Sequence, residues 1–344
     1  MSTQTATSDT GAGIETENRL LGSLRSLRQS PTAVVGAVVV GLLVVMAVFA
    51  TIDNYLFERA VITSLHADPH AMDQANAYAA PSAAHPLGTD QFGRDILARI
   101  VYGSRIALAI GVIAVGIGFT GGVVVGSVAA YFGGYVDDVL MRLAEVLFSV
   151  PALILALVFM AVFGANIYNL FLAYGIIGIP GYARVMRSEV FSIREEQYID
   201  AAKTAGLPSW KILFREVIPN GLATVMVQAT LSMGGVIIGA AALSFLGFGV
   251  QPPTASWGRM LSDARQALLV APWVAAAPGL MIFLTVMGFN MLGDGLRDAM
   301  DPKITLGEEG WDDAELAEFG WRDPTGEVGN EFARDADAGT GGDD

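Results

Sequence analysis

The chain has 344 residues, of which 53% are hydrophobic and 40 are glycines, and its mean hydropathy is positive. This composition excludes an ordinary soluble enzyme and is typical of a protein that crosses a membrane several times. The net charge is −14, only 3 of the 20 basic residues are lysines, and the absence of cysteine excludes disulfides and thiolate metal sites. Such an acidic, lysine-poor composition resembles that of halophile proteins, whose charges are screened by concentrated salt.

The first part of the chain is polar and is followed by an apolar run. Residues 1–18 are rich in Ser, Thr, Gly and Glu, and we expect them to be disordered because they cannot bury enough apolar surface. Residues 19–75 form an N-terminal region with the first transmembrane helix at 33–52, an uncharged stretch about 30 Å long as a helix. We expect an extracellular segment at 76–105, which leads into the second helix.

The remaining apolar runs predict five further spans. The second run carries Gly118, Gly122 and Gly126 at four-residue spacing, a face on which another helix can approach closely. The third run is too long for one helix and is expected to break at Gly164-Ala165-Asn166. The sequence therefore predicts an all-α polytopic membrane protein with six transmembrane helices, located at 33–52, 106–132, two within 146–183, 222–248 and 274–292.

A polar island of two short helices separates the fourth and fifth predicted spans, from Glu195 to Asn220. Tyr198 to Ala205 lacks Pro and Gly and is expected to be helical. Gly206 is predicted to end this helix in the left-handed conformation, which only glycine adopts without a Cβ penalty. The island is thus expected to begin with a short helix that stops at Gly206.

A tight turn and a second helix are predicted next. Leu207 precedes a proline and is therefore pushed out of the helical region. Ser209 is expected to accept hydrogen bonds from the first amides of a helix that runs to about Val217, before Pro219.

The distribution of Lys and Arg predicts the orientation in the membrane. With the N-terminus inside, the inner segments hold 14 basic residues and the outer segments hold 6. The inner segments are the N-terminus, a turn at 133–145, the loop at 184–219 and the C-terminus. This asymmetry predicts that both termini and the polar island are cytoplasmic.

Three separated motifs resemble one family. Tyr-x-Asp-Ala-Ala-x-x-x-Gly from Tyr198, followed by Val-Ile-Pro-Asn, resembles the EAA loop of binding-protein-dependent ABC importer permeases. HPLGTDQFGRDILARIVYGSRIAL, from His85, resembles the start of the transmembrane module in C-type permeases of dipeptide, oligopeptide and nickel importers. LGDGLRD, from Leu292, together with Asp301-Pro302, resembles that family's end signature, so the resemblance covers about residues 20–303.

The resemblance implies a MetI-like permease fold with an ABC transmembrane domain at 106–303 and a cytoplasmic coupling loop at 189–220. Asp200 stands where the family more often has Glu, and Glu216 where peptide-type members often have His. In such permeases, ATP-driven closure of the ATPases would move the loop as a rigid lever and switch the pore between outward and inward access. The implied ATPase-coupling residues are Tyr198, Asp200, Ala201, Ala202, Gly206, Leu207, Ile218 and Pro219.

The implied function is that of a permease subunit in an ATP-driven importer for peptides or related small solutes such as nickel complexes. The implied partners are a B-type permease in a heterodimer, two cytosolic ABC ATPase subunits, an extracellular solute-binding protein and membrane lipid, but no nucleic acid. ATP and Mg would bind the ATPase subunits, and this chain would hold no cofactor or metal. The chain contains no Walker A loop, H-E-x-x-H or G-x-S-x-G motif, so it is not expected to be an enzyme.

Several alternatives remain open from the sequence. A secondary transporter or channel without an ATPase partner would usually carry ionisable residues at mid-membrane, and the predicted spans contain none. His66, Asp68, His70 and Asp73 could share a metal ion, although the intervening Pro69 favours a hydrated loop. Glu145 could contact the ATPase or simply cap the inner end of a span.

The last segment, residues 304–344, is predicted to be an acidic disordered tail. From Gly307 onward it holds 13 acidic and 2 basic residues. With few aromatic residues, it has too little apolar surface to fold alone.

Overall fold

A computed structural model describes residues 30–300, and the predictions for the N-terminus before residue 30 and for the acidic tail lie outside these residues. The described part is helical and contains no β-strand, in agreement with the predicted fold class. Its helices, in chain order, are α2 (Pro31–Leu56), α3 (Ala60–Leu65), η1 (Gln74–Asn76), α4 (Ile96–Phe132), α5 (Gly134–Phe148), α6 (Ala152–Phe163), α7 (Ile167–Arg194), α8 (Gln197–Thr204), α9 (Ser209–Ile212), η2 (Leu213–Val217), α10 (Ile218–Phe245), α11 (Trp257–Ala264), η3 (Arg265–Ala267) and α12 (Trp273–Met300).

Four of the described helical stretches are long and apolar enough to cross a membrane. They are α2, α4, the continuous stretch Ser209–Phe245 and α12. A fifth span results if α5 and α6, which meet at an angle of 87°, form one broken span. The predicted count of six is therefore not confirmed. The expected break at 164–166 is confirmed, because α6 ends at Phe163 and α7 begins at Ile167.

One predicted boundary is wrong. The sequence predicts a turn at 133–145, but α5 occupies most of this range. The charged residues of this segment favour a turn when the sequence is considered alone. In the fold, the charge of Asp137 is neutralised by a partner on α7. Asp137 accepts two hydrogen bonds of 2.6 Å from the guanidinium of Arg187, and this pair joins α5 to α7.

The helix pair α4 and α7 forms the most extensive contact in the described bundle. The predicted glycine face is the surface of α4 that meets α7. A Cβ on Gly122 would lie 2.8 Å from the amide nitrogen of Ala183, and one on Gly118 would lie 3.0 Å from the carbonyl oxygen of Gly175. Only glycine at these positions lets the two backbones approach so closely.

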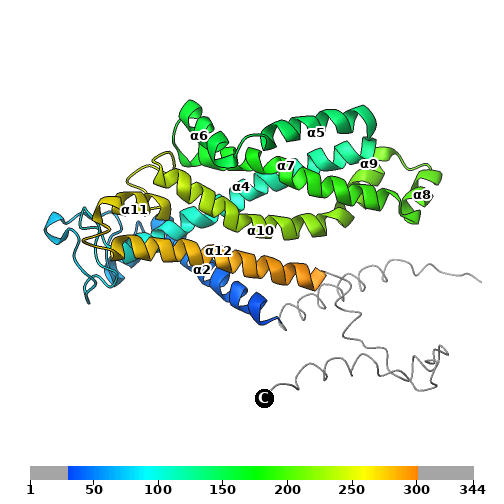
Figure 1. The fold of residues 1–344 in the computed structure, drawn as a ribbon. Helices are drawn as coiled ribbons and strands as arrows, with labels where there is room; N and C mark the ends of the chain where they lie inside the picture. Colours follow the sequence, from blue (N-terminus) through cyan, green and yellow to red (C-terminus); the bar gives the residue numbers. More distant parts are fainter. Residues whose placement is uncertain (1–29, 301–344) are drawn as a thin grey trace, which may run out of the picture. The chain divides into compact units, whose positions relative to one another are not determined.

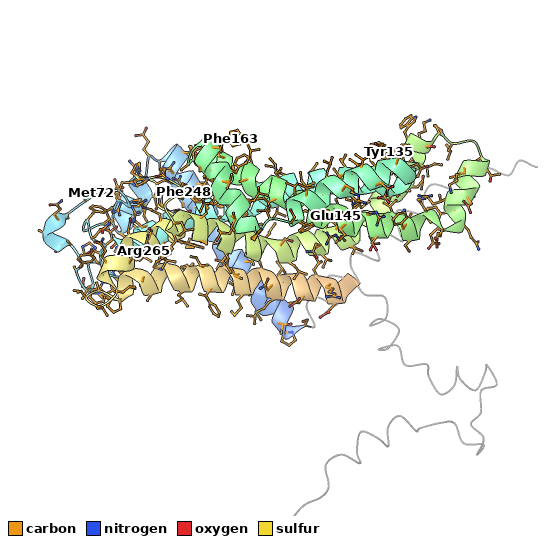
Figure 2. All side chains as sticks on the ribbon, turned by 45° about the horizontal axis from the view of Figure 1, so that its top comes forward. Met72, Tyr135, Glu145, Phe163, Phe248 and Arg265 are labelled. Carbon is orange, nitrogen blue, oxygen red and sulfur yellow. The ribbon has the colours of Figure 1, made fainter. Side chains whose placement is uncertain are left out.

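The two ends of the bundle carry different structures (Figure 1). The segment between α2 and α4 gathers with α11 at one end, whereas α8 and α9 lie at the opposite end. Figure 2 places Met72 and Arg265 near the first end, and Tyr135 lies toward the second. The start of α2 lies beside the end of α12, because a Cβ on Gly295 would meet the backbone and side chain of Ala33.

At the end that carries the segment between α2 and α4, buried charged side chains join this segment to the start of α4. Asp95 caps α4 by accepting a hydrogen bond of 2.8 Å from the amide of Ala98, and its other oxygen lies 2.8 Å from Nδ1 of His85 and 2.9 Å from Nε2 of His66. Asp95 and Arg99 lie four residues apart at the start of α4, but they do not form an ion pair with each other. Nε of Arg99 instead lies 3.7 Å from Oδ2 of Asp90.

The metal alternative for this segment is not supported by the geometry. Among the described residues, no group of three or more His, Asp or Glu side chains could hold a metal ion. Asp68 accepts a hydrogen bond of 2.8 Å from the backbone amide of His70, and Asp73 caps η1, so both carboxylates serve local turns.

A buried carboxylate joins α2 to α4 at the same end. Asp53 is 1% exposed and accepts a hydrogen bond of 2.7 Å from the hydroxyl of Tyr102. Its two oxygens also accept hydrogen bonds from the backbone amides of Val61 and Ile62 at 3.0 and 3.1 Å. This carboxylate thereby fixes the chain reversal after α2 against the first turns of α4.

Candidate coupling loop

The predicted first helix of the polar island is α8, and it ends as expected. Gly206 has φ of +77° in the left-handed region, and its amide donates to the carbonyl of Lys203 at 3.0 Å. The amide of Leu207 donates to the carbonyl of Ala202 at 3.2 Å. These bonds satisfy carbonyls that would otherwise be unpaired at the helix end.

The two faces of α8 differ sharply. Ile199 is fully buried, and Ala202 is half-buried against the same cluster of buried residues. Ala201 is exposed, and Tyr198 has an exposed fraction of 41%. The sequence places Ala201 and Ala202 together in one small-residue motif, whereas in the structure only Ala201 lies on the open face.

The second helix differs from the prediction in its start and its length. Ser209 is the first residue of α9, and no side chain caps this helix, so the predicted cap by Ser209 is wrong. The helix also does not stop before Pro219. It continues through the π-helical turn η2 into α10, where Pro219 occupies the first turn. Proline is accommodated there because it comes just after the π-helical turn, where the regular α-helical bonding pattern is interrupted.

The island is firmly attached to the bundle by apolar contacts. Ile199, Ile212, Leu213 and Val217 are each at most 2% exposed. They share one buried cluster with residues of α7 and α10, namely Tyr182, Met186, Val190, Ile193, Val225 and Ala229. Because close-packed interiors deform little, α8 and α9 are held as a rigid extension of the helices on either side.

Large apolar side chains lie exposed on this island, and most of them are not among the coupling residues that the sequence predicts. Trp210 is 60% exposed, Phe214 is 61% exposed and Leu207 is 42% exposed. The spacing of Trp210 and Phe214 by four residues could have indicated one apolar helix face. Exposed aromatic side chains of this kind are enriched at protein–protein interfaces. We call Tyr198, Ala201, Leu207, Trp210 and Phe214 the island's apolar surface.

Charged and polar groups surround this surface. Asp200 forms an exposed ion pair with Lys203 at 2.9 Å, and Asn220 donates to the hydroxyl of Tyr198 at 3.4 Å. Partial burial raises the pKa of the Tyr198 hydroxyl, and the nearby Glu196 and Glu216 raise it further. The phenol is therefore neutral at physiological pH. An open hollow of 840 Å³ lies beside α8 and is lined by Ser192, Glu195, Glu196, Gln197, Tyr198 and Ala201.

The remaining predicted residues lie at the junction with α10 and at the turn. Ile218 is half-buried against the cluster that holds the island, and Pro219 is exposed. Gly206 is exposed, and a Cβ at this position would have no neighbouring atom within 4 Å. Its role in the fold is therefore purely conformational.

Comparison with known proteins decides the family. Residues 122–306 match the family described as binding-protein-dependent transport system inner membrane component. Residues 21–81 match the N-terminal transmembrane domain of oligopeptide transport permease C. The chain belongs to this family of ABC importer permeases.

Named relatives cover most of the permease. This chain is 40% identical to the dipeptide transport system permease protein DppC of Alkalihalophilus pseudofirmus over 282 residues. The aligned residues cover 82% of this chain and 89% of the relative. This chain is 41% identical over 281 residues to the glutathione transport system permease protein GsiD of Escherichia coli O157:H7, covering 81% and 89% of the two chains. The GsiD of Pectobacterium atrosepticum is 45% identical over 224 residues, covering 65% and 74%.

Family membership confirms two further predictions. The chain is a multi-pass membrane protein, and its family consists of membrane subunits that are not themselves enzymes. The buried side chains that attach the island lie within the matched range of 122–306.

Proposed function

We propose that this permease imports short peptides and that the island's apolar surface docks on a cytosolic ABC ATPase. The observation that carries the docking proposal is the pairing of an exposed face with a buried one. Trp210 and Phe214 are 60% and 61% exposed, while Ile212 and Val217, on the same helical stretch, are fully packed. Such an element can receive a force on one face and transmit it through the other.

The substrate proposal rests on the relatives. One is named for dipeptide transport and the others for glutathione transport, and these substrates share the peptide bond. Nickel complexes, which the sequence resemblance leaves open, receive no support from these names. A solute-binding protein is expected to deliver the peptide, because the matched family takes its name from such transport systems.

The proposed complex contains a second permease of the B type, two ATPase chains that bind ATP and Mg, and the solute-binding protein. In this complex the two permeases would share the pore. ATP-driven closure of the ATPases would push on the island, and the buried cluster around Ile199 would pass that movement to α7 and α10.

The test is peptide uptake by vesicles that contain the full complex. ATP should drive uptake of a labelled dipeptide, whereas a proton or sodium gradient alone should not. Phe214→Ala should reduce both ATPase copurification and uptake by about tenfold, since removing an aromatic anchor from an interface typically costs about 1–2 kcal/mol or more. Tyr168→Ala is the matched control, because Tyr168 is 74% exposed but lies on α7 far from the island in sequence.

Two results would contradict the proposal in different ways. Uptake that is driven by an ion gradient without ATP would identify a secondary transporter. Normal ATP-driven uptake by Phe214→Ala, with ATPase copurification unchanged, would show that the coupling surface lies elsewhere.

A further inference from the structure

An apolar groove of about 340 Å³ runs between α2 and α4. Val48, Ile52, Leu108, Val112 and Ile113 line it, together with Arg105. Val48, Ile52, Val112 and Ile113 are between 42% and 50% exposed. Because both helices are membrane spans, these side chains face either lipid or another membrane subunit.

Arg105 marks one end of this groove. The two helices are joined near that end by the hydrogen bond from Tyr102 to Asp53, one turn before Arg105 on α4 and just after Ile52 on α2. Tyr55, in the last turn of α2, is 76% exposed. Exposed tyrosines of membrane helices concentrate at the level of the lipid headgroups, so Arg105 lies close to the membrane–water boundary.

The guanidinium of Arg105 has unused hydrogen-bonding capacity. It lies over the ring of Tyr102, 5.3 Å from the ring centre. Nε of Arg105 is buried, and within residues 30–300 it has no hydrogen-bond partner. The carboxylate of Asp53, which lies beside Tyr102, accepts hydrogen bonds from the Tyr102 hydroxyl and two backbone amides. The groove therefore combines an apolar floor with the guanidinium of Arg105 at its headgroup end.

We propose that this groove binds an anionic phospholipid, with the phosphate on Arg105 and one acyl chain along the apolar side chains. A guanidinium can donate two parallel hydrogen bonds to phosphate, which fixes the headgroup as well as neutralising the charge. From Arg105 to Ile113 the groove follows α4 for about 12 Å, most of the depth of one leaflet of the hydrocarbon core. Basic side chains between membrane helices are known to bind anionic lipid headgroups.

The test is native mass spectrometry of the full complex in mild detergent, with phosphatidylglycerol and phosphatidylcholine of identical acyl chains. The wild-type complex should retain phosphatidylglycerol in preference to phosphatidylcholine. Arg105→Gln should weaken phosphatidylglycerol binding by about fivefold, the ratio expected for one arginine near a lipid headgroup. Arg105→Lys should retain most of the binding because the charge remains.

A second set of variants separates the acyl chain from the headgroup. Ala109→Phe should fill the groove and remove both lipids, since Ala109 lies in its wall. Val124→Phe is the matched control, because Val124 is 50% exposed on the same helix but outside the groove. Equal phosphatidylglycerol retention by wild type, Arg105→Gln and Ala109→Phe would overturn the proposal.

A measurement on the unaltered protein guards against misfolded variants. Phosphatidylglycerol with a photoreactive group in its acyl chain should label the peptide that contains Leu108, Val112 and Ile113 in the wild-type complex. Labelling confined to other helices would contradict the site. A photoreactive amino acid in place of Val112 that crosslinks to the second permease, and not to lipid, would assign the groove to subunit contact and overturn the lipid proposal.

Discussion

Ala201 and Ala202 are neighbours in the sequence, yet they lie on different faces of α8. Ala201 is exposed, while Ala202 is half-buried against the cluster that contains Ile199. A larger side chain should therefore have different effects at the two positions. Only the first would meet a partner protein.

The first prediction compares Ala201→Trp with Ala202→Trp. Ala201→Trp should change folding stability by less than about 0.5 kcal/mol but reduce ATPase copurification about tenfold, because it adds bulk at the proposed interface. Ala202→Trp should lower stability by about 1–3 kcal/mol through overpacking. Melting temperature in detergent and copurification measure the two effects. Equal loss of stability in both variants would refute the two-faced arrangement.

The second prediction concerns the left-handed residue at the end of α8. Gly206→Val should reduce ATP-driven uptake, because a β-branched residue at φ of +77° is strained and shifts the turn. Gly206→Asn is the control, since Asn tolerates this conformation better and no neighbouring atom blocks its Cβ. If Gly206→Val and Gly206→Asn transport equally, the conformation of this residue does not matter for coupling.

The third prediction tests the bond between α2 and α4. Tyr102→Phe removes the hydroxyl that donates to buried Asp53 at 2.7 Å. A hydrogen bond to a charged group contributes about 1.5–3 kcal/mol, so the variant should melt at a lower temperature. Tyr135→Phe, which changes a tyrosine that is 83% exposed, should melt like the wild type. Equal melting temperatures for both variants would show that the bond contributes nothing to stability.

The fourth prediction follows from His70. Burial lowers its pKa below the ordinary value of 6.5, Arg59 lowers it further by repulsion, and Asp68 opposes both effects. The unfolded imidazole therefore binds a proton at higher pH than the folded one. Stability should consequently decrease as the pH falls below about 6.5. His70→Gln should reduce this acid sensitivity, and an unchanged dependence of melting temperature on pH would exclude His70 as its source.

The fifth prediction is topological and uses the absence of cysteine in the sequence. Ser82 and Ser192 are both exposed and lie in the segments at opposite ends of the bundle. Ser82→Cys should react with an impermeant maleimide added outside the cell, whereas Ser192→Cys should react only after the membrane is opened. Outside labelling of Ser192→Cys would place the island on the wrong side for an ATPase.

Much of the fold could be predicted from apolar runs and glycines. The break before Ile167 and the close approach of another helix at Gly122 follow from local sequence alone, whereas the identity of that helix as α7 does not. The start of α5 could not be predicted this way. Asp137 resembles a loop residue until Arg187, 50 positions later, neutralises it. Such a pair is visible only after the chain has folded.

In the candidate coupling loop, too, features set by local sequence could be predicted, whereas those set by distant contacts could not. The position of Gly206 follows from its own conformational freedom, and the structure places it as predicted. The orientation of Ala202 depends on Tyr182, Val190 and other partners from distant segments, so the sequence could not separate it from Ala201. Pro219 misled the prediction of the helix end, because the π-helical turn before it allows the helix to continue.

Because α9, η2 and α10 form one continuous helical stretch, they connect the two ends of the bundle directly. Ser209–Phe245 is one stretch of 37 residues, about 55 Å long at the rise of an α-helix. Its far end is tied to the next segment, because the carbonyl of Phe245 accepts hydrogen bonds from Ser262 and Arg265. A tilt of about five degrees in a rod of this length displaces its tip by about 5 Å. A small movement at Trp210 would therefore displace α11, at the opposite end of the bundle.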